Sequence, residues 1–135
     1  MAEKKKELHL LRHAELFDDA LVTVSAHAPK KFRNNIVHDL QMTSENIVKS
    51  IFWANEYRQS DIQQCLKYTK EAENNIRWMT RRLERARRME CITPVEELDL
   101  GDKLATVEEY FAGWSDSNKK LSEELRKEEL RKKNL

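Results

Sequence analysis

The chain of 135 residues is long enough for one domain, and its composition is typical of amphipathic helices. Two glycines and two prolines are too few for the turns of a β-barrel or a β-sandwich. The formal net charge of +1, from 25 basic and 24 acidic side chains, excludes a uniformly basic coat for nucleic acid. No run of 18 apolar residues is present, so we expect no membrane-spanning segment. With only Cys65 and Cys91 and no secretion signal, we expect no disulfide framework and a cytoplasmic location.

Apolar residues recur at intervals of three and four, and this spacing predicts long helices. We expect the first helix over residues 7–27, ending before Pro29, because a proline disfavours helical angles in the residue that precedes it. The second helix should span residues 30–57. The third should begin at a capping box formed by Ser60 and Gln63 and continue to about residue 90.

A helix start follows at Thr93-Pro94-Val95-Glu96, with threonine as the cap and proline in the first turn. Because Gly101 comes soon after, we expect a short turn there and a fourth helix over residues 102–118. Residues 119–135 repeat Glu with Lys and Arg, and are too polar to dock firmly, so we expect a charged, frayed or disordered tail. The prediction is an all-α, antiparallel up-down four-helix bundle over residues 1–118.

The first candidate binding surface lies in the predicted third helix, on the face opposite its apolar stripe. Four arginines recur there at intervals of four, four and three residues, namely Arg77, Arg81, Arg85 and Arg88. Trp78 and Arg82 lie among them. Guanidinium groups make bidentate contacts with phosphate and carboxylate, and an exposed ring can stack on a base. RNA, single-stranded DNA and an acidic protein surface all fit this face, and a solvated face with no partner is the simplest alternative.

A second basic cluster, Lys30-Lys31-x-Arg33, stands at the start of the predicted second helix, where free amides and the helix dipole favour an anion. Acidic residues gather elsewhere, because seven carboxylates and a single lysine occupy residues 96–116. The molecule is therefore electrostatically polar despite its net charge. This polarity favours contact between subunits as well as binding to a polyanion.

One sequence feature suggests an enzyme. The stretch Arg33-Asn34-Asn35-Ile36-Val37-His38 resembles the Arg-x(4–6)-His signature of the HEPN ribonucleases, which are small helical bundles. The resemblance implies a metal-independent ribonuclease in which Arg33 holds the phosphate and His38 moves a proton. His9 and His13 are four residues apart, but no further ligands complete a metal site, so we expect no metal and no cofactor.

A further alternative is a helical adaptor that binds only protein. Met42, Phe52 and Trp53 lie on one flank of the predicted second helix, beside its buried stripe. A helix that touches two neighbours within a bundle needs such a wide apolar arc. The other interpretation is that this flank meets another subunit.

Between Pro29 and Trp114 the sequence resembles the Avd proteins, the accessory variability determinants of diversity-generating retroelements. The matching features are, in order, Pro29-Lys30-Lys31, Arg77-Trp78-x-x-Arg81-Arg82-Leu83, Ile92-Thr93-Pro94 and Ala112-Gly113-Trp114. The resemblance implies a non-enzymatic four-helix bundle that assembles into a homopentameric barrel. It also implies binding to the retroelement's reverse transcriptase and to RNA or DNA during mutagenic copying. The contacts implied for this chain are Lys30, Lys31, Arg33, Arg77, Arg81, Arg85 and Arg88.

Overall fold

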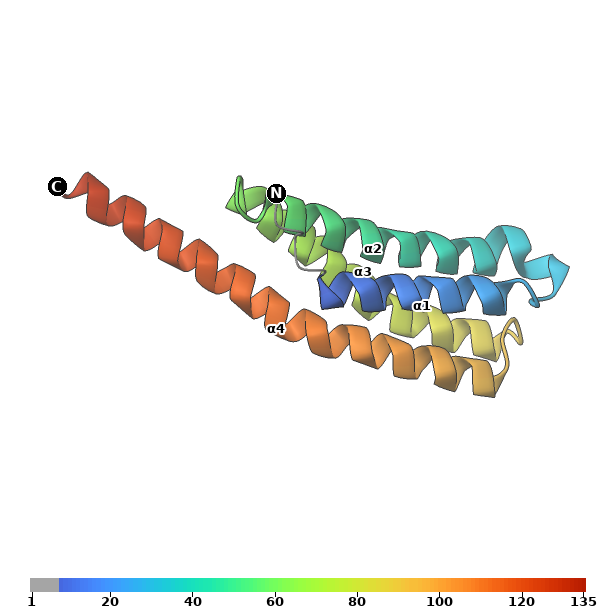
Figure 1. The fold of residues 1–135 in the computed structure, drawn as a ribbon. Helices are drawn as coiled ribbons and strands as arrows, with labels where there is room; N and C mark the ends of the chain where they lie inside the picture. Colours follow the sequence, from blue (N-terminus) through green and yellow to red (C-terminus); the bar gives the residue numbers. More distant parts are fainter. Residues whose placement is uncertain (1–7) are drawn as a thin grey trace, which may run out of the picture.

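Four helices pack as an antiparallel bundle in the computed structural model, which describes residues 8–135 (Figure 1). They are α1 (His9–Ser25), α2 (His38–Tyr57), α3 (Ile62–Arg88) and α4 (Pro94–Lys133). Each helix packs against the next in the chain, and α1 also packs against α4. The predicted all-α four-helix bundle is confirmed. No helix within residues 8–135 is long and apolar enough to cross a membrane.

The core consists of the apolar stripes that the sequence predicted on each helix. Its large buried members include Leu10, Phe17, Leu40, Ile47, Met79, Leu83, Leu104 and Val107. Complete burial of one such side chain contributes about 1.5–3 kcal/mol. Burial of these stripes therefore supplies most of the free energy that holds the four highly charged helices together.

The segment predicted as the beginning of the second helix has a different local geometry. A short 3-10 helix, η1 (Lys30–Phe32), leads into a π-helical turn, η2 (Arg33–Val37), before α2 begins. Phe32 and Val37 are both buried, and their separation of five residues corresponds to the hydrogen-bond spacing of a π-helix. The wider turn therefore lets both side chains face the core.

The start of α3 corrects the predicted capping box. The cap is Asp61, whose Oδ1 accepts a hydrogen bond from the Gln64 amide at 3.3 Å, so the pair Ser60 and Gln63 was the wrong choice. Aspartate is as good a cap as serine, and the two candidates are adjacent in the sequence. The prediction therefore missed by one residue.

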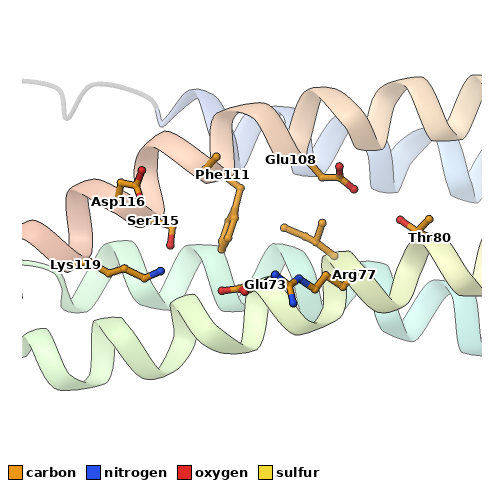
Figure 2. A pocket seen from close by; sticks show the side chains of 10 residues that line it. Glu73, Arg77, Thr80, Glu108, Phe111, Ser115, Asp116 and Lys119 are labelled. Atoms are coloured by element: carbon orange, nitrogen blue, oxygen red, sulfur yellow. Dashed lines mark ion pairs between the residues drawn. The ribbon is translucent and has the colours of Figure 1, made fainter.

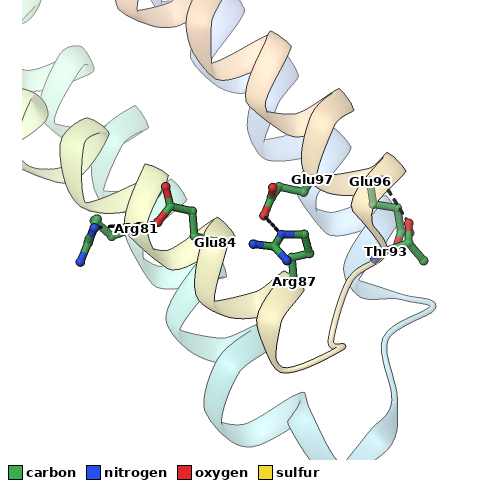
Figure 3. Close-up of polar contacts among 6 residues, drawn as sticks. All are labelled: Arg81, Glu84, Arg87, Thr93, Glu96 and Glu97. Atoms are coloured by element: carbon green, nitrogen blue, oxygen red, sulfur yellow. Dashed lines mark hydrogen bonds and ion pairs between the residues drawn. The ribbon is translucent and has the colours of Figure 1, made fainter.

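At its start, α4 confirms one prediction and corrects another. Thr93 Oγ1 accepts from the Glu96 amide at 3.1 Å, which confirms Thr93 as the cap, and the Thr93 amide donates to Glu96 Oε1 at 2.8 Å, so the two residues form a capping box (Figure 3). The helix then continues through Gly101 instead of stopping. Leu100 and Leu104 are buried on either side of that glycine, and their packing outweighs its cost of about 1 kcal/mol.

The far end of α4 extends beyond the other helices (Figure 1). The structure continues it as helix to Lys133, so the predicted end at residue 118 was wrong. Residues 119–135 contribute nothing to the buried core, in line with their polar sequence. That this stretch frays in solution stays a prediction.

A buried polar network holds α4 where it leaves the bundle. Asn118 is fully buried, accepts from Arg58 Nε at 2.9 Å and donates to Thr69 Oγ1 at 3.2 Å. Arg58 also donates to Ser117 Oγ at 3.0 Å. These bonds tie the turn between α2 and α3 to α4. They therefore fix the register of α4 at the end of the core.

Candidate nucleic-acid interface

The two predicted basic clusters lie at the same end of the bundle. Because α2 and α3 are antiparallel, the start of α2 lies beside the end of α3, and Arg82 Nη1 contacts Asp39 Oδ2 across them at 3.3 Å. The connection between α1 and α2 and the one between α3 and α4 share this end (Figure 1). We call it the basic end, and assign to it Lys30, Lys31, Arg33, Arg85 and Arg88.

The cluster before α2 is open to solvent. Lys30, Lys31 and Arg33 are all exposed, and none forms an ion pair within the described part of the chain. The Lys31 ammonium lies 5.0 Å from the centre of the Phe32 ring, and Phe32 is buried. The buried ring therefore anchors the cluster at the surface while its charges stay free.

The arginines of α3 divide into three groups. Arg85 is half-buried and Arg88 is exposed, and among residues 8–135 neither contacts a carboxylate. Their charge is therefore free, as in the cluster before α2. Glu90 follows closely with a φ of 61°, a left-handed conformation that turns the chain toward α4.

Arg77 and Arg81 form the second group, and each has a partner on its own helix. Arg77 lies 3.2 Å from Glu73, and Arg81 lies 3.9 Å from Glu84 (Figures 2 and 3). Their side chains remain 78% and 73% exposed. Exposed pairs within a helix contribute only about 0.3–0.5 kcal/mol, so a phosphate would displace these carboxylates at little cost.

Arg82 and Arg87 form the third group, and both connect helices. Arg82 is paired with Asp39 of α2, and its guanidinium lies 4.2 Å from the centre of the Trp78 ring. Arg87 Nε donates to Glu97 Oε2 of α4 at 2.9 Å (Figure 3). Only 20% of the Arg82 side chain is exposed, so it is the least available of the predicted contacts. Trp78 stays 46% exposed, with Arg82 covering one face.

The predicted row of arginines is therefore not one continuous surface. Arg77 lies in an open hollow between α3 and α4, which Glu108, Phe111 and Asp116 of α4 also line (Figure 2). This surface carries both signs of charge and does not suit a polyanion. The basic end is the part of the predicted site where, among residues 8–135, the basic side chains form no ion pair with a carboxylate.

Arg33 and His38, the pair considered for catalysis, stand at the two ends of the π-helical turn. Both side chains are exposed, and no contact joins them in the structure. The two residues are five apart, which is the hydrogen-bond spacing of a π-helix. Their side chains therefore point in neighbouring directions on the outside of the bundle.

The two cysteines and His13, which could be reactive, are held in contacts within the bundle. Burial raises the pKa of both Cys65 and Cys91 above the usual thiol value, which keeps them protonated and weakly nucleophilic. The His13 ring stacks on Tyr110 of α4 at 4.8 Å between centroids. Within residues 8–135, no group of three His, Cys, Asp or Glu side chains could hold a metal ion.

Neither a comparison with protein-family models nor one with curated proteins gave a match for this chain.

Proposed function

We propose that this protein is a non-enzymatic accessory factor of a diversity-generating retroelement, which binds the reverse transcriptase and its template RNA to support mutagenic copying. The motifs between Pro29 and Trp114 that resemble the Avd proteins support the identity of the partners. The binding role rests on the basic end, where five basic side chains have no carboxylate partner within the described part of the chain. Those five are Lys30, Lys31, Arg33, Arg85 and Arg88.

Binding at the basic end would follow from charge. Each phosphate that a lysine or arginine neutralises releases condensed counterions, so affinity falls as salt rises. The rigid helices hold the charges in place, which limits the ordering cost of binding. Arg77 and Arg81 would add weaker contacts, because their carboxylate partners are exposed and easily exchanged.

Assembly into a homopentamer is part of the same proposal. A ring of identical bundles would present several basic ends to one RNA, and several weak contacts on one strand raise the overall affinity without any new interaction. The molecule's electrostatic polarity, with carboxylates concentrated in residues 96–116, suits contact between copies.

The direct test combines RNA binding with capture of the enzyme. The purified full chain should bind single-stranded RNA, and its affinity should fall steeply between about 50 and 400 mM salt. The slope of log affinity against log salt should correspond to several neutralised phosphates. In a pull-down it should also retain a reverse transcriptase of a diversity-generating retroelement. Absence of both interactions at low salt would overturn the proposal.

The alternative is a metal-independent ribonuclease, and the π-helical turn between Arg33 and His38 is the observation that favours it. In that case RNA would be cleaved in the presence of a chelator, and His38→Ala would abolish cleavage while leaving RNA binding intact. Such a result would replace the non-enzymatic proposal.

A further inference from the structure

The last turns of α4 carry apolar side chains that are exposed in the part of the chain that the structure describes. We call residues 119–133 the α4 overhang; it extends about 22 Å past Asn118, the last fully buried residue of the helix. Leu125 and Leu130 are 43% and 53% exposed. Helices of this length are marginal in water, and most owe their stability to packing of an apolar face. The overhang therefore lacks the contact that usually stabilises such a helix.

A groove of matching size runs between α3 and α4. Two adjoining hollows of about 470 and 370 Å³ form it, and both are lined by Thr80 and Glu108. The α4 side presents small residues on one face, namely Gly101, Ala105 and Ala112. Nothing lies within 4 Å of the point where a side chain on Gly101 would begin. From Glu97 to Asp116 the groove is about 30 Å long, enough for the overhang.

The overhang and the groove have opposite charge. Residues 94–118 carry seven carboxylates and one lysine, whereas residues 119–135 carry seven basic side chains and four carboxylates. Three of the carboxylates along the groove, Asp102, Glu108 and Asp116, have no ion-pair partner in the described part of the chain.

The charges also match in spacing. The three groove carboxylates are six and eight residues apart. Basic side chains on the overhang recur at similar intervals, as Lys119-Lys120, Arg126-Lys127 and Arg131-Lys132-Lys133. At about 100° per residue, Arg126 and Lys133 share one face of the overhang with Leu130, so a helix lying along the groove could present these three side chains to it at once.

We propose that the α4 overhang of one copy of this protein docks in the α3–α4 groove of another copy. Because α4 is one unbroken helix, the overhang beyond Lys119 points away from the groove of its own bundle, and we therefore assign the groove to the overhang of a second copy (Figure 1). Leu130 lies over the small residues of the groove, and Arg126 and Lys133, which share its helix face, meet the carboxylates. Each copy both donates an overhang and offers a groove, an arrangement that closes as a dimer or a ring. The contact would build the oligomer proposed above, but it needs neither RNA nor reverse transcriptase.

Two charge reversals test this contact on the full chain. Arg126→Glu with Lys133→Glu reverses two charges on the docking face of the overhang, and Asp102→Lys with Glu108→Lys reverses two charges of the groove. All four side chains are exposed, so the bundle should fold normally, as circular dichroism would verify. Light scattering should find the parent assembled at low salt, and each variant alone at the monomer mass of 16.1 kDa. An equimolar mixture of the two variants should regain assembly, because the glutamates introduced on one variant's overhang then meet the lysines introduced in the other variant's groove.

A matched control is Arg12→Glu with Lys67→Glu, which reverses two exposed charges away from both surfaces and should keep the parent's mass. A parent that stays monomeric at low salt, variants that assemble like the parent, or a mixture that stays monomeric would each overturn the proposal. Because the measurement contains no RNA, its failure would leave the proposed RNA binding standing, and the reverse also holds.

Discussion

Two sets of arginines in this protein differ in what surrounds them, although the sequence gives them similar settings. Arg58, Arg82 and Arg87 each connect two parts of the bundle through a hydrogen bond or ion pair, and we call them the connecting arginines. Arg85 and Arg88 lie within a few residues of two of these and contact no carboxylate in the described chain. Helical spacing therefore predicts the direction in which a side chain points. The neighbouring helices decide whether its charge is paired or is available to a ligand.

The largest expected effect comes from removing four of the five charges of the basic end. Replacing Lys30, Lys31, Arg85 and Arg88 by alanine should weaken single-stranded RNA binding by at least about 100-fold at low salt. The slope of log affinity against log salt should become shallower by about three, because each of the four lost phosphate contacts contributes about 0.7 to that slope. Filter binding over a salt series measures both. An unchanged slope would mean that RNA binds elsewhere.

The second effect concerns stability. Arg58→Ala should lower the free energy of unfolding by about 2–3 kcal/mol, because it leaves the fully buried Asn118 oxygen without its donor. Urea denaturation followed by circular dichroism measures this loss. Arg12→Ala, an exposed arginine on α1, is the control and should change stability by less than about 0.5 kcal/mol. Equal stability of the two variants would show that the network contributes little.

A smaller loss is expected at the contact between α2 and α3. Arg82→Ala should cost about 1–2 kcal/mol, because it removes the ion pair with Asp39 and uncovers one face of Trp78. Trp78 should become more accessible to a fluorescence quencher, with Trp78→Phe identifying its share of the signal. RNA affinity per folded molecule should stay within about twofold. A large loss of affinity would move Arg82 to the binding surface.

The smallest effect is a gain at the turn after α3. Glu90 has a positive φ that costs a side chain about 1 kcal/mol, and glycine takes that conformation freely. Glu90→Gly should therefore raise the free energy of unfolding by about 0.5–1 kcal/mol and also remove a negative charge from the basic end. A lower melting temperature would contradict this account of the turn.

Periodicity in the sequence was enough to predict the helices and their buried faces, because apolar stripes such as the one through Leu40 and Ile47 have one favourable way to pack. It failed at Gly101, where tertiary packing outweighs local preference, and at Ser60, where the next residue is an equal cap. It also missed Asn118, because a polar residue on an apolar stripe gives no sign of its partners. The division of the α3 arginines needed three dimensions, since Asp39 and Glu97 come from other helices.

The most direct test of the account compares two double variants that remove the same charge from the same helix. Arg85→Ala with Arg88→Ala removes two free arginines, and Arg82→Ala with Arg87→Ala removes two connecting ones. Binding to single-stranded RNA at fixed low salt, measured at a temperature where both are folded, should fall about tenfold or more for the first variant and hardly change for the second. Equal loss of affinity in both variants would show that RNA senses only the total charge of α3, and would contradict the assignment of the basic end.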